Sequence, residues 1–143
     1  MKFTSIQWDS ELYDQEVQLR DAVLRIPLGL TFTPEQIAAE QNQLHFGVLD
    51  SNQLIGCVVG VPLSTTLIKI RQMAVLPERQ RSGIGSFLIK NVEQALSGKG
   101  FHQIEMNARK VALGFYERLG YQIEGNEFIE VNIPHFKMTK QIG

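Results

Sequence analysis

The sequence lacks most of the features that mark secreted, membrane-bound or nucleic-acid-binding proteins. It has one cysteine, Cys57, so no intrachain disulfide can form, and no basic residue adjoins Cys57 to produce a reactive thiolate. Its apolar run, LIGCVVGV, is shorter than the ~18 residues that a membrane helix needs. The N-terminal MKFTSIQWDSE lacks the apolar segment of a signal peptide. The net charge of −1 gives no general attraction to nucleic acid or anionic membranes. We therefore expect a cytoplasmic protein that binds neither.

The chain has 143 residues, of which 43% are hydrophobic, and this favours one domain spanning residues 1–143 with its own core. Apolar periodicity, capping residues and turn residues predict helices at 10–25, from Pro34, at 83–97 and at 111–119. Strand segments are predicted at 3–8, 45–50, 53–61, 66–75, 103–108, 121–124, 127–131 and 135–140. We write the order as β-α-α-β-β-β-α-β-α-β-β. It indicates an α/β (α+β) fold, with a mixed central sheet of about seven strands and helices on both faces.

The stretch Gln80-Arg81-Ser82-Gly83-Ile84-Gly85 stands between a strand and a helix, where backbone amides can bind an anion. The first amides of a helix have no internal acceptor, and glycines let a phosphate approach the backbone. A plain connecting loop is the alternative, since short glycine motifs are weak evidence. A dinucleotide-binding GxGxxG motif would need a small residue where Leu88 stands, and a Walker loop would need Lys where Ser86 stands. Both of those motifs are excluded.

The same six residues match [QR]xxGx[GA], and the chain here resembles the GCN5-related N-acetyltransferases (GNAT). FYERLGY at 115–121 resembles a second signature of that family, and both motifs occur in the expected order. The tail NIPHFKM and the FYERLGY helix are also similar to small bacterial ElaA-like acetyltransferases. The resemblance implies a single-domain GNAT-like fold that binds acetyl-CoA in a gap between two splayed strands, with homodimers common in the family.

The resemblance also implies which residues hold acetyl-CoA. The expected set is Met73, Ala74 and Val75 on the strand, Gln80, Arg81, Ser82, Gly83, Ile84, Gly85 and Ser86 on the loop, and Asn107, Arg109 and Tyr116 beyond it. One position departs from the family pattern, because Arg109 stands where an amide side chain is usual. Either Arg109 or the nearby Asn107 then contacts the cofactor.

Catalysis in such enzymes needs an acid for the departing thiolate and a base for the amine. Tyr116 is the expected acid, because a phenol of pKa ~10 can protonate a thiolate of pKa ~8.5. The strand LIKIRQMAV lacks the glutamate that many members use, which leaves Glu105, Glu130 and His135 as candidate bases. The three histidines are scattered, so no metal site is predicted, and the histidine at position 45, at the start of an apolar strand, is expected to be structural.

The sequence therefore favours an acetyl-CoA-dependent N-acetyltransferase that acts by direct attack of a primary amine of a small molecule or peptide. Two alternatives remain: an inactive protein that binds CoA or acyl-CoA, and a transferase using a longer acyl-CoA. Lys69 and Arg71 alternate with apolar residues and so share one face of their strand, which suits either a carboxylate-bearing acceptor or a solvated surface. The apolar IPLGL at 26–30 occupies the family's acceptor-specifying loop.

Overall fold

A computed structural model describes all residues, 1–143, and shows one mixed sheet with helices on both faces. The sheet has eight strands in the order β1-β2-β3-β4-β5-β8-β6, with β7 also paired to β8. The strands are β1 Lys2–Ile6, β2 Leu44–Asp50, β3 Gln53–Pro62, β4 Leu67–Val75, β5 Gln103–Arg109, β6 Gln122–Ile123, β7 Phe128–Glu130 and β8 Ile133–Gln141. The expected mixed α/β sheet is confirmed.

The helices begin where the sequence places capping residues. Ser10 accepts a hydrogen bond from the Tyr13 amide and starts α1, Glu11–Arg20. Thr33 forms a capping box with Gln36 at the start of α2, Pro34–Ala39. The remaining helices are α3 Ile84–Gly98 and α4 Leu113–Arg118.

The first helix differs from its predicted range of 10–25. Regular α-helix stops at Arg20, and the chain continues as a π-helical turn, Asp21–Arg25, and a 3-10 turn, Ile26–Leu28. Pro27 has no amide hydrogen and its ring would clash with the carbonyl of Val23, four residues earlier, so regular α-helix cannot continue through it. Gly29, at φ 73°, then reverses the chain. This irregular segment leaves the side chains of IPLGL exposed beside the sheet.

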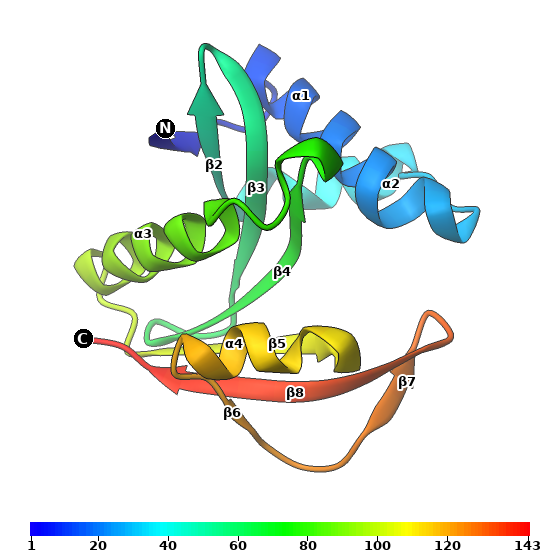
Figure 1. Cartoon of the computed structure of the whole chain (residues 1–143). Helices are drawn as coiled ribbons and strands as arrows, with labels where there is room; N and C mark the ends of the chain where they lie inside the picture. The colour runs from blue at the N-terminus through cyan, green and yellow to red at the C-terminus, as the bar shows by residue number, and fades with distance from the viewer.

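The sheet opens at its one parallel joint. β4 and β5 pair only through Leu67–Lys69 and Gln103–Glu105, near the start of both strands. Further along, β4 carries a bulge: Arg71 lies opposite Val59 and Ala74 opposite Cys57, which leaves two residues, Gln72 and Met73, facing one. Gln72 has a φ of 57° at this bulge. The two strands therefore diverge, and Figure 1 shows β1–β4 and the β5–β8 group as two separating halves.

Each face of the sheet has its own core. The larger core packs α3 and α4 against one face through residues such as Leu88, Val92 and Tyr116. The smaller core packs α1 against the other face, around Tyr13 and Leu19. Cys57 is fully buried in the smaller core, and burial raises the pKa of its thiol, so it stays protonated. None of the helices combines the length and the apolar character needed to cross a bilayer.

Candidate functional site

Two cavities meet where β4 separates from β5. The first, of about 450 Å³, lies between the end of β4, the N-terminus of α3 and α4. The second, of about 480 Å³, lies between β4, β5, the β7–β8 hairpin and the 24–30 segment. Met73, Ala112 and Tyr116 line both of them. A molecule that extends from one cavity into the other therefore passes these three residues.

The first cavity brings together most of the residues expected to hold acetyl-CoA. Its lining includes Met73, Ala74, Val75, Gln80, Arg81, Gly83, Ile84, Gly85, Ser86 and Tyr116. The first backbone hydrogen bond of α3 runs from the Phe87 amide to the Gly83 carbonyl. The amides of Ile84, Gly85 and Ser86 therefore have no acceptor within the helix. Ser82 does not line the cavity, because its hydroxyl turns back to the Arg79 carbonyl.

The loop before α3 is held in shape by its own side chains. The Gln80 amide donates to the Val75 carbonyl at 3.1 Å, so it ties the loop to the end of β4. Arg79 is paired with Asp50 at 2.6 Å, and the hydrogen bond and charge of Arg79 hold the pKa of that carboxyl below its ordinary value. Arg81, at φ 65°, makes no ion pair and lines the cavity. The loop therefore presents one uncompensated cation and three free amides to the same space.

The two glycines of the motif have different structural roles. Gly83 is the residue before α3 and has a φ of 83°, a conformation that strains any other residue. Gly85 lies against α4, where a Cβ atom would come within 3.1 Å of Phe115 Cζ. The second glycine thus allows α3 and α4 to pack closely at the cavity wall. This close packing joins the QRSGIG motif to FYERLGY in space.

Tyr116 is buried at the junction of the two cavities. Its side chain packs edge-on against Phe115 and Tyr121, and its residue is 9% exposed. Its hydroxyl has one weak protein contact, to Met73 Sδ at 3.9 Å. Burial raises the pKa of Tyr116 to about 12, so the hydroxyl keeps its proton at neutral pH. The phenol is therefore a proton donor without a strong partner of its own.

The second cavity collects two of the three candidate bases and both candidates for the missing amide contact. Asn107, Arg109, Glu130 and His135 all line it. Glu105 does not, although it lies on the same strand, and its carboxylate faces Lys137 at 3.8 Å. The structure thus places Glu130 and His135 in the lining of the second cavity and Glu105 outside it.

His135 has one nitrogen assigned by its surroundings. Its Nδ1 lies 2.7 Å from the Ile133 carbonyl, which can only accept, so Nδ1 carries the proton. In the neutral ring, Nε2 then holds a lone pair, and it lies 3.6 Å from Glu130 Oε2. Glu130 Oε1 in turn accepts a hydrogen bond from Asn107 at 3.2 Å. This arrangement suits an imidazole that takes up a proton and a carboxylate that stabilises the resulting charge.

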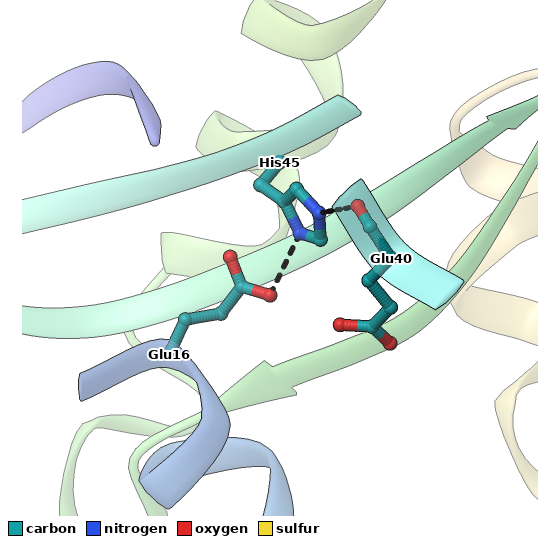
Figure 2. Close-up of side chains that lie close together, drawn as sticks. All are labelled: Glu16, Glu40 and His45. Atoms are coloured by element: carbon teal, nitrogen blue, oxygen red, sulfur yellow. Dashed lines mark hydrogen bonds and ion pairs between the residues drawn. The ribbon is translucent and has the colours of Figure 1, made fainter. Parts of the chain in front are cut away.

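The sequence reasoning missed a buried ionic cluster next to the second cavity. Glu16, Arg20, Glu40 and His45 come from three separate parts of the chain, and all are at most 3% exposed. Arg20 donates to Glu16 at 2.6 Å and to Glu40 at 2.8 Å. Figure 2 shows His45 between Glu16 and the backbone carbonyl of Glu40, at 2.9 and 3.0 Å. The Glu16–Arg20 spacing of four on a helix was the one signal available in the sequence.

The charges in this cluster balance among its own side chains. Both nitrogens of His45 face acceptors, so both must donate, and the ring is an imidazolium. Burial opposes that charge, but the hydrogen bond and charge of Glu16 outweigh it and raise the pKa of His45. Burial likewise opposes the charge of Glu40, yet Arg20 lowers the pKa of this carboxyl. With Glu16 and Glu40 ionised and Arg20 and His45 protonated, the net charge of the cluster is zero.

The spacing of Glu16, Glu40 and His45 also satisfies a geometric criterion for metal ligation, because one ligand atom from each lies within 4.8 Å of the others. Arg20, however, donates to both carboxylates. An arginine at that position supplies the positive charge that a metal would bring. The cluster is best described as an ionic support that joins α1 and the Glu40 turn to β2, which agrees with the structural role expected for His45.

Comparisons with known proteins agree with this geometry. A family model described as an acetyltransferase (GNAT) domain matches residues 31–142. YyaT of Bacillus subtilis, an uncharacterised protein, is 30% identical over 138 residues, which cover 89% of this chain and 91% of YyaT.

Two solved structures show the same fold at low identity. An aminoglycoside 6'-N-acetyltransferase complexed with coenzyme A aligns with a TM-score of 0.84 and 18% identity, over 99% of this chain and 97% of that one. Escherichia coli ElaA aligns with a TM-score of 0.82 and 16% identity, over 98% of this chain and 99% of ElaA. The family model and the two glycine-containing motifs, joined at one cavity, lead to a single conclusion: the chain belongs to the GNAT family of acetyltransferases, enzymes that take an acetyl group from an acyl-CoA donor.

Proposed function

We propose that the protein transfers the acetyl group of acetyl-CoA directly to a primary amine. The observation that carries the proposal is the junction of the two cavities at Tyr116, where a buried hydroxyl has no strong partner. One cavity offers free amides and Arg81 to a diphosphate, and the other offers a base to an amine. Two substrates entering from opposite sides would meet at this hydroxyl. The aminoglycoside acetyltransferase of the same fold, which was solved with coenzyme A, supports the choice of donor.

The diphosphate of the donor is assigned to the N-terminus of α3. The amides of Ile84, Gly85 and Ser86 and the partial positive charge of the helix end would bind it, with Arg81 adding a charged hydrogen bond. The pantetheine arm would then run along Met73 to Val75, whose backbone is not paired with β5 because the two strands have diverged. This path leads the thioester to Tyr116.

The chemical step follows from the groups around the junction. The amine nitrogen attacks the thioester carbon, a C–N bond forms, and the C–S bond breaks. His135 Nε2 receives the proton that the amine loses, and Glu130 stabilises the imidazolium. Tyr116 donates its proton to the departing thiolate. Burial raises the pKa of the phenol, and the same desolvation would raise that of a thiolate formed beside it, so the two shifts offset each other.

The first experiment is a thermal-shift titration with acetyl-CoA and CoA, with NADH and ATP as controls. A ligand that binds only the folded protein stabilises it by ~2.7 kcal/mol at a hundredfold excess over Kd. Stabilisation by the two CoA compounds alone supports the assignment of the α3 N-terminus. An equal response to all four, or to none, contradicts it.

The second experiment follows thiol release from acetyl-CoA with a panel of amines, and from propionyl-CoA and butyryl-CoA alongside. Amine-dependent thiol release supports transfer. CoA binding without any release would favour the inactive CoA-binding alternative. Faster release from a longer acyl-CoA would show that the acyl group has been assigned wrongly.

A further inference from the structure

The second cavity is lined by more positive charge than its own carboxylates can balance. Arg25, Lys69, Arg71 and Arg109 all line it, and Glu130 is the one carboxylate that does so. Arg25, Lys69 and Arg109 make no ion pair anywhere in the chain. Glu130 is already engaged by Asn107 and His135. Positive charge enclosed by low-dielectric walls attracts an anion more strongly than the same charge on an open surface.

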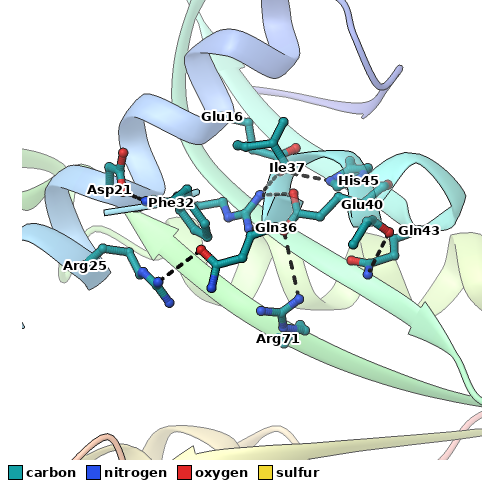
Figure 3. A network of polar contacts seen from close by, with 12 residues as sticks. Glu16, Asp21, Arg25, Phe32, Gln36, Ile37, Glu40, Gln43, His45 and Arg71 are labelled. Carbon is teal, nitrogen blue, oxygen red and sulfur yellow. Dashed lines mark hydrogen bonds and ion pairs between the residues drawn. The ribbon is translucent and has the colours of Figure 1, made fainter. Parts of the chain in front are cut away.

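Arg71 has one acid nearby, but that acid is already neutralised. Arg71 lies 3.9 Å from Glu40 Oε2, whereas Arg20 and the Tyr13 hydroxyl bind the two oxygens of Glu40 at hydrogen-bonding distance. Figure 3 shows Arg71 approaching this network from β4, below the Glu40 turn. Burial lowers the pKa of Arg71, and the charges of Arg20 and Arg25 add to that effect, while the charges of Glu40 and Glu130 oppose it. The buried cluster thus compensates the charge of Arg71 only in part.

The oxygens that the Arg25 guanidinium contacts are all uncharged. Its guanidinium lies 3.4 Å from the Thr31 carbonyl and 3.4 Å from the Gln36 side chain, and it stacks over the ring of Phe32. Figure 3 shows the contact with Gln36. Stacking orients the guanidinium but supplies no negative charge. Arg25 and Arg71 therefore present two forked donors to one cavity, a geometry that suits an oxyanion.

Lys69 extends the same positive surface along β4. It alternates with the buried Ile68 and Ile70, so it shares a face with Arg71. Glu105 is its partner across the parallel pair, but the Glu105 carboxylate faces Lys137 and lies more than 4.0 Å from the Lys69 ammonium. Leu24, Leu28 and Leu30, from the segment that also carries Arg25, add apolar groups to the lining. The cavity thus combines cationic and apolar groups.

The donor's diphosphate does not account for these cations. It is assigned to the first cavity, whose lining shares Met73, Ala112 and Tyr116 with the second but none of the four cations. We propose that the acceptor is an amine that also carries an oxyanion, a carboxylate or a phosphate, next to an apolar body, with Lys69, Arg71 and Arg25 binding the oxyanion. This inference rests on the proposed function, because it assigns the second cavity to the acceptor. It disfavours polycationic amines as substrates.

The test compares pairs of amines in which one member carries an anionic group and the other lacks it. L-phenylalanine is compared with L-phenylalaninamide, and phosphoethanolamine with ethanolamine, while spermine serves as the polycation. The amine of the amide is less basic, so more of it is unprotonated at neutral pH, and this bias works against the proposal. We expect kcat/KM to favour the anionic member of at least one pair by about ten- to a hundredfold, the value of one charged hydrogen bond. The two pairs distinguish a carboxylate from a phosphate as the preferred anion.

The variants Lys69→Met and Arg71→Met should remove most of that preference through a higher KM for the anionic amine, with KM for the uncharged partner little changed. Arg118→Met, on the exposed side of α4, is the matched control and should keep the preference. Lys69 contacts no part of the buried cluster, so Lys69→Met remains informative if Arg71→Met fails to fold. If Lys69→Met and Arg71→Met both fold and both keep the preference for the anionic amine, the assignment is overturned.

A binding measurement separates failure of this inference from failure of the proposed function. Calorimetry on the CoA-saturated protein compares N-acetyl-L-phenylalanine with its amide, and O-phosphoethanolamine with ethanolamine. Tighter binding of the anionic members, lost in Lys69→Met, supports the anion site even if no amine is acetylated. Transfer to neutral amines or spermine at equal or greater kcat/KM, without selective anion binding, overturns the inference and leaves the acetyltransferase proposal intact.

Discussion

Replacing Arg20 by Met tests how much the buried ionic cluster beside the second cavity stabilises the fold. Arg20 is fully buried and forms charged hydrogen bonds to two carboxylates, Glu16 and Glu40. Met keeps most of the apolar stem but leaves a net charge of −1 among the remaining three groups. Removing one partner from a buried ion pair costs about 3–5 kcal/mol, because the other charge is left without compensation. For a domain whose free energy of unfolding is about 5–15 kcal/mol, this is a large part of the total.

The loss should depend on pH in a direction that the pKa shifts fix. In the wild-type protein the pKa of Glu40 is lowered from 4.5, so its contribution to stability is present above pH 4.5 and is lost as the pH falls through the folded-state pKa. The pKa of His45 is raised from 6.5, so its contribution is full below pH 6.5 and is lost as the pH rises through the folded-state pKa. In Arg20→Met, burial is no longer opposed by Arg20, and the pKa of Glu40 should rise.

The variant should therefore regain part of its stability at acidic pH, where Glu40 takes up a proton. Urea denaturation at pH 5.5 and pH 8, followed by circular dichroism, measures the difference in free energy of unfolding between wild type and variant. We expect a larger difference at pH 8 and a partial rescue by Glu40→Gln in the Arg20→Met background. The exposed Arg118→Met is the matched control and should change stability by about 0.5 kcal/mol or less. A loss below about 1 kcal/mol, or one equal at both pH values, would refute the charge argument.

Three further predictions concern the cavities. Tyr116→Phe should lower kcat by about 10²–10⁴-fold, because it removes the proton donor. The Kd for CoA, measured by calorimetry, should not change, because the ring is kept. An unchanged kcat across the accessible pH range would exclude Tyr116 as the acid. His135→Gln should lower kcat by about 10²-fold or more, again with the Kd for CoA unchanged, and a variant that keeps full turnover would move the base elsewhere. Gly85→Val should weaken CoA binding, because its Cβ atom would meet Phe115 Cζ at 3.1 Å, and Phe115→Ala in the same chain should restore part of the affinity. A Gly85→Val protein with wild-type affinity would contradict the close packing of α3 on α4, and Gly98→Ala, where a Cβ meets nothing, is the control.

Local signals along the chain account for the elements that the sequence predicted well. Ser10 and Thr33 start helices because a short polar side chain can satisfy a free amide, and this depends on neighbouring residues alone. The loop before α3 is equally local, since two glycines and a following apolar stripe define both the turn and the buried face of the helix. The alternation of Lys69 with buried isoleucines likewise predicted which side of β4 is polar.

The catalytic assignments depended on contacts that the sequence could not rank. Glu130 and His135 were the favoured candidate bases and Glu105 a further one, but each is only one ionisable residue on a strand segment, which is weak evidence in a sequence. The hairpin of β7 and β8 brings Glu130 and His135 to the second cavity, whereas Glu105 lies outside it. Pairing between strands selects among such residues, and the partner of a strand is not encoded by its own periodicity.

The sequence by itself determined the family, the glycine-containing loop before α3 and the polar face of β4, because each depends on residues within a few positions of one another. The tertiary structure alone decided the bulge at Gln72, the divergence of β4 from β5, and the ionic cluster that gathers Glu16, Glu40 and His45 around Arg20. These features join residues that are distant along the chain, and their energies come from burial and charge compensation, which exist only once the sheet and its helices have packed.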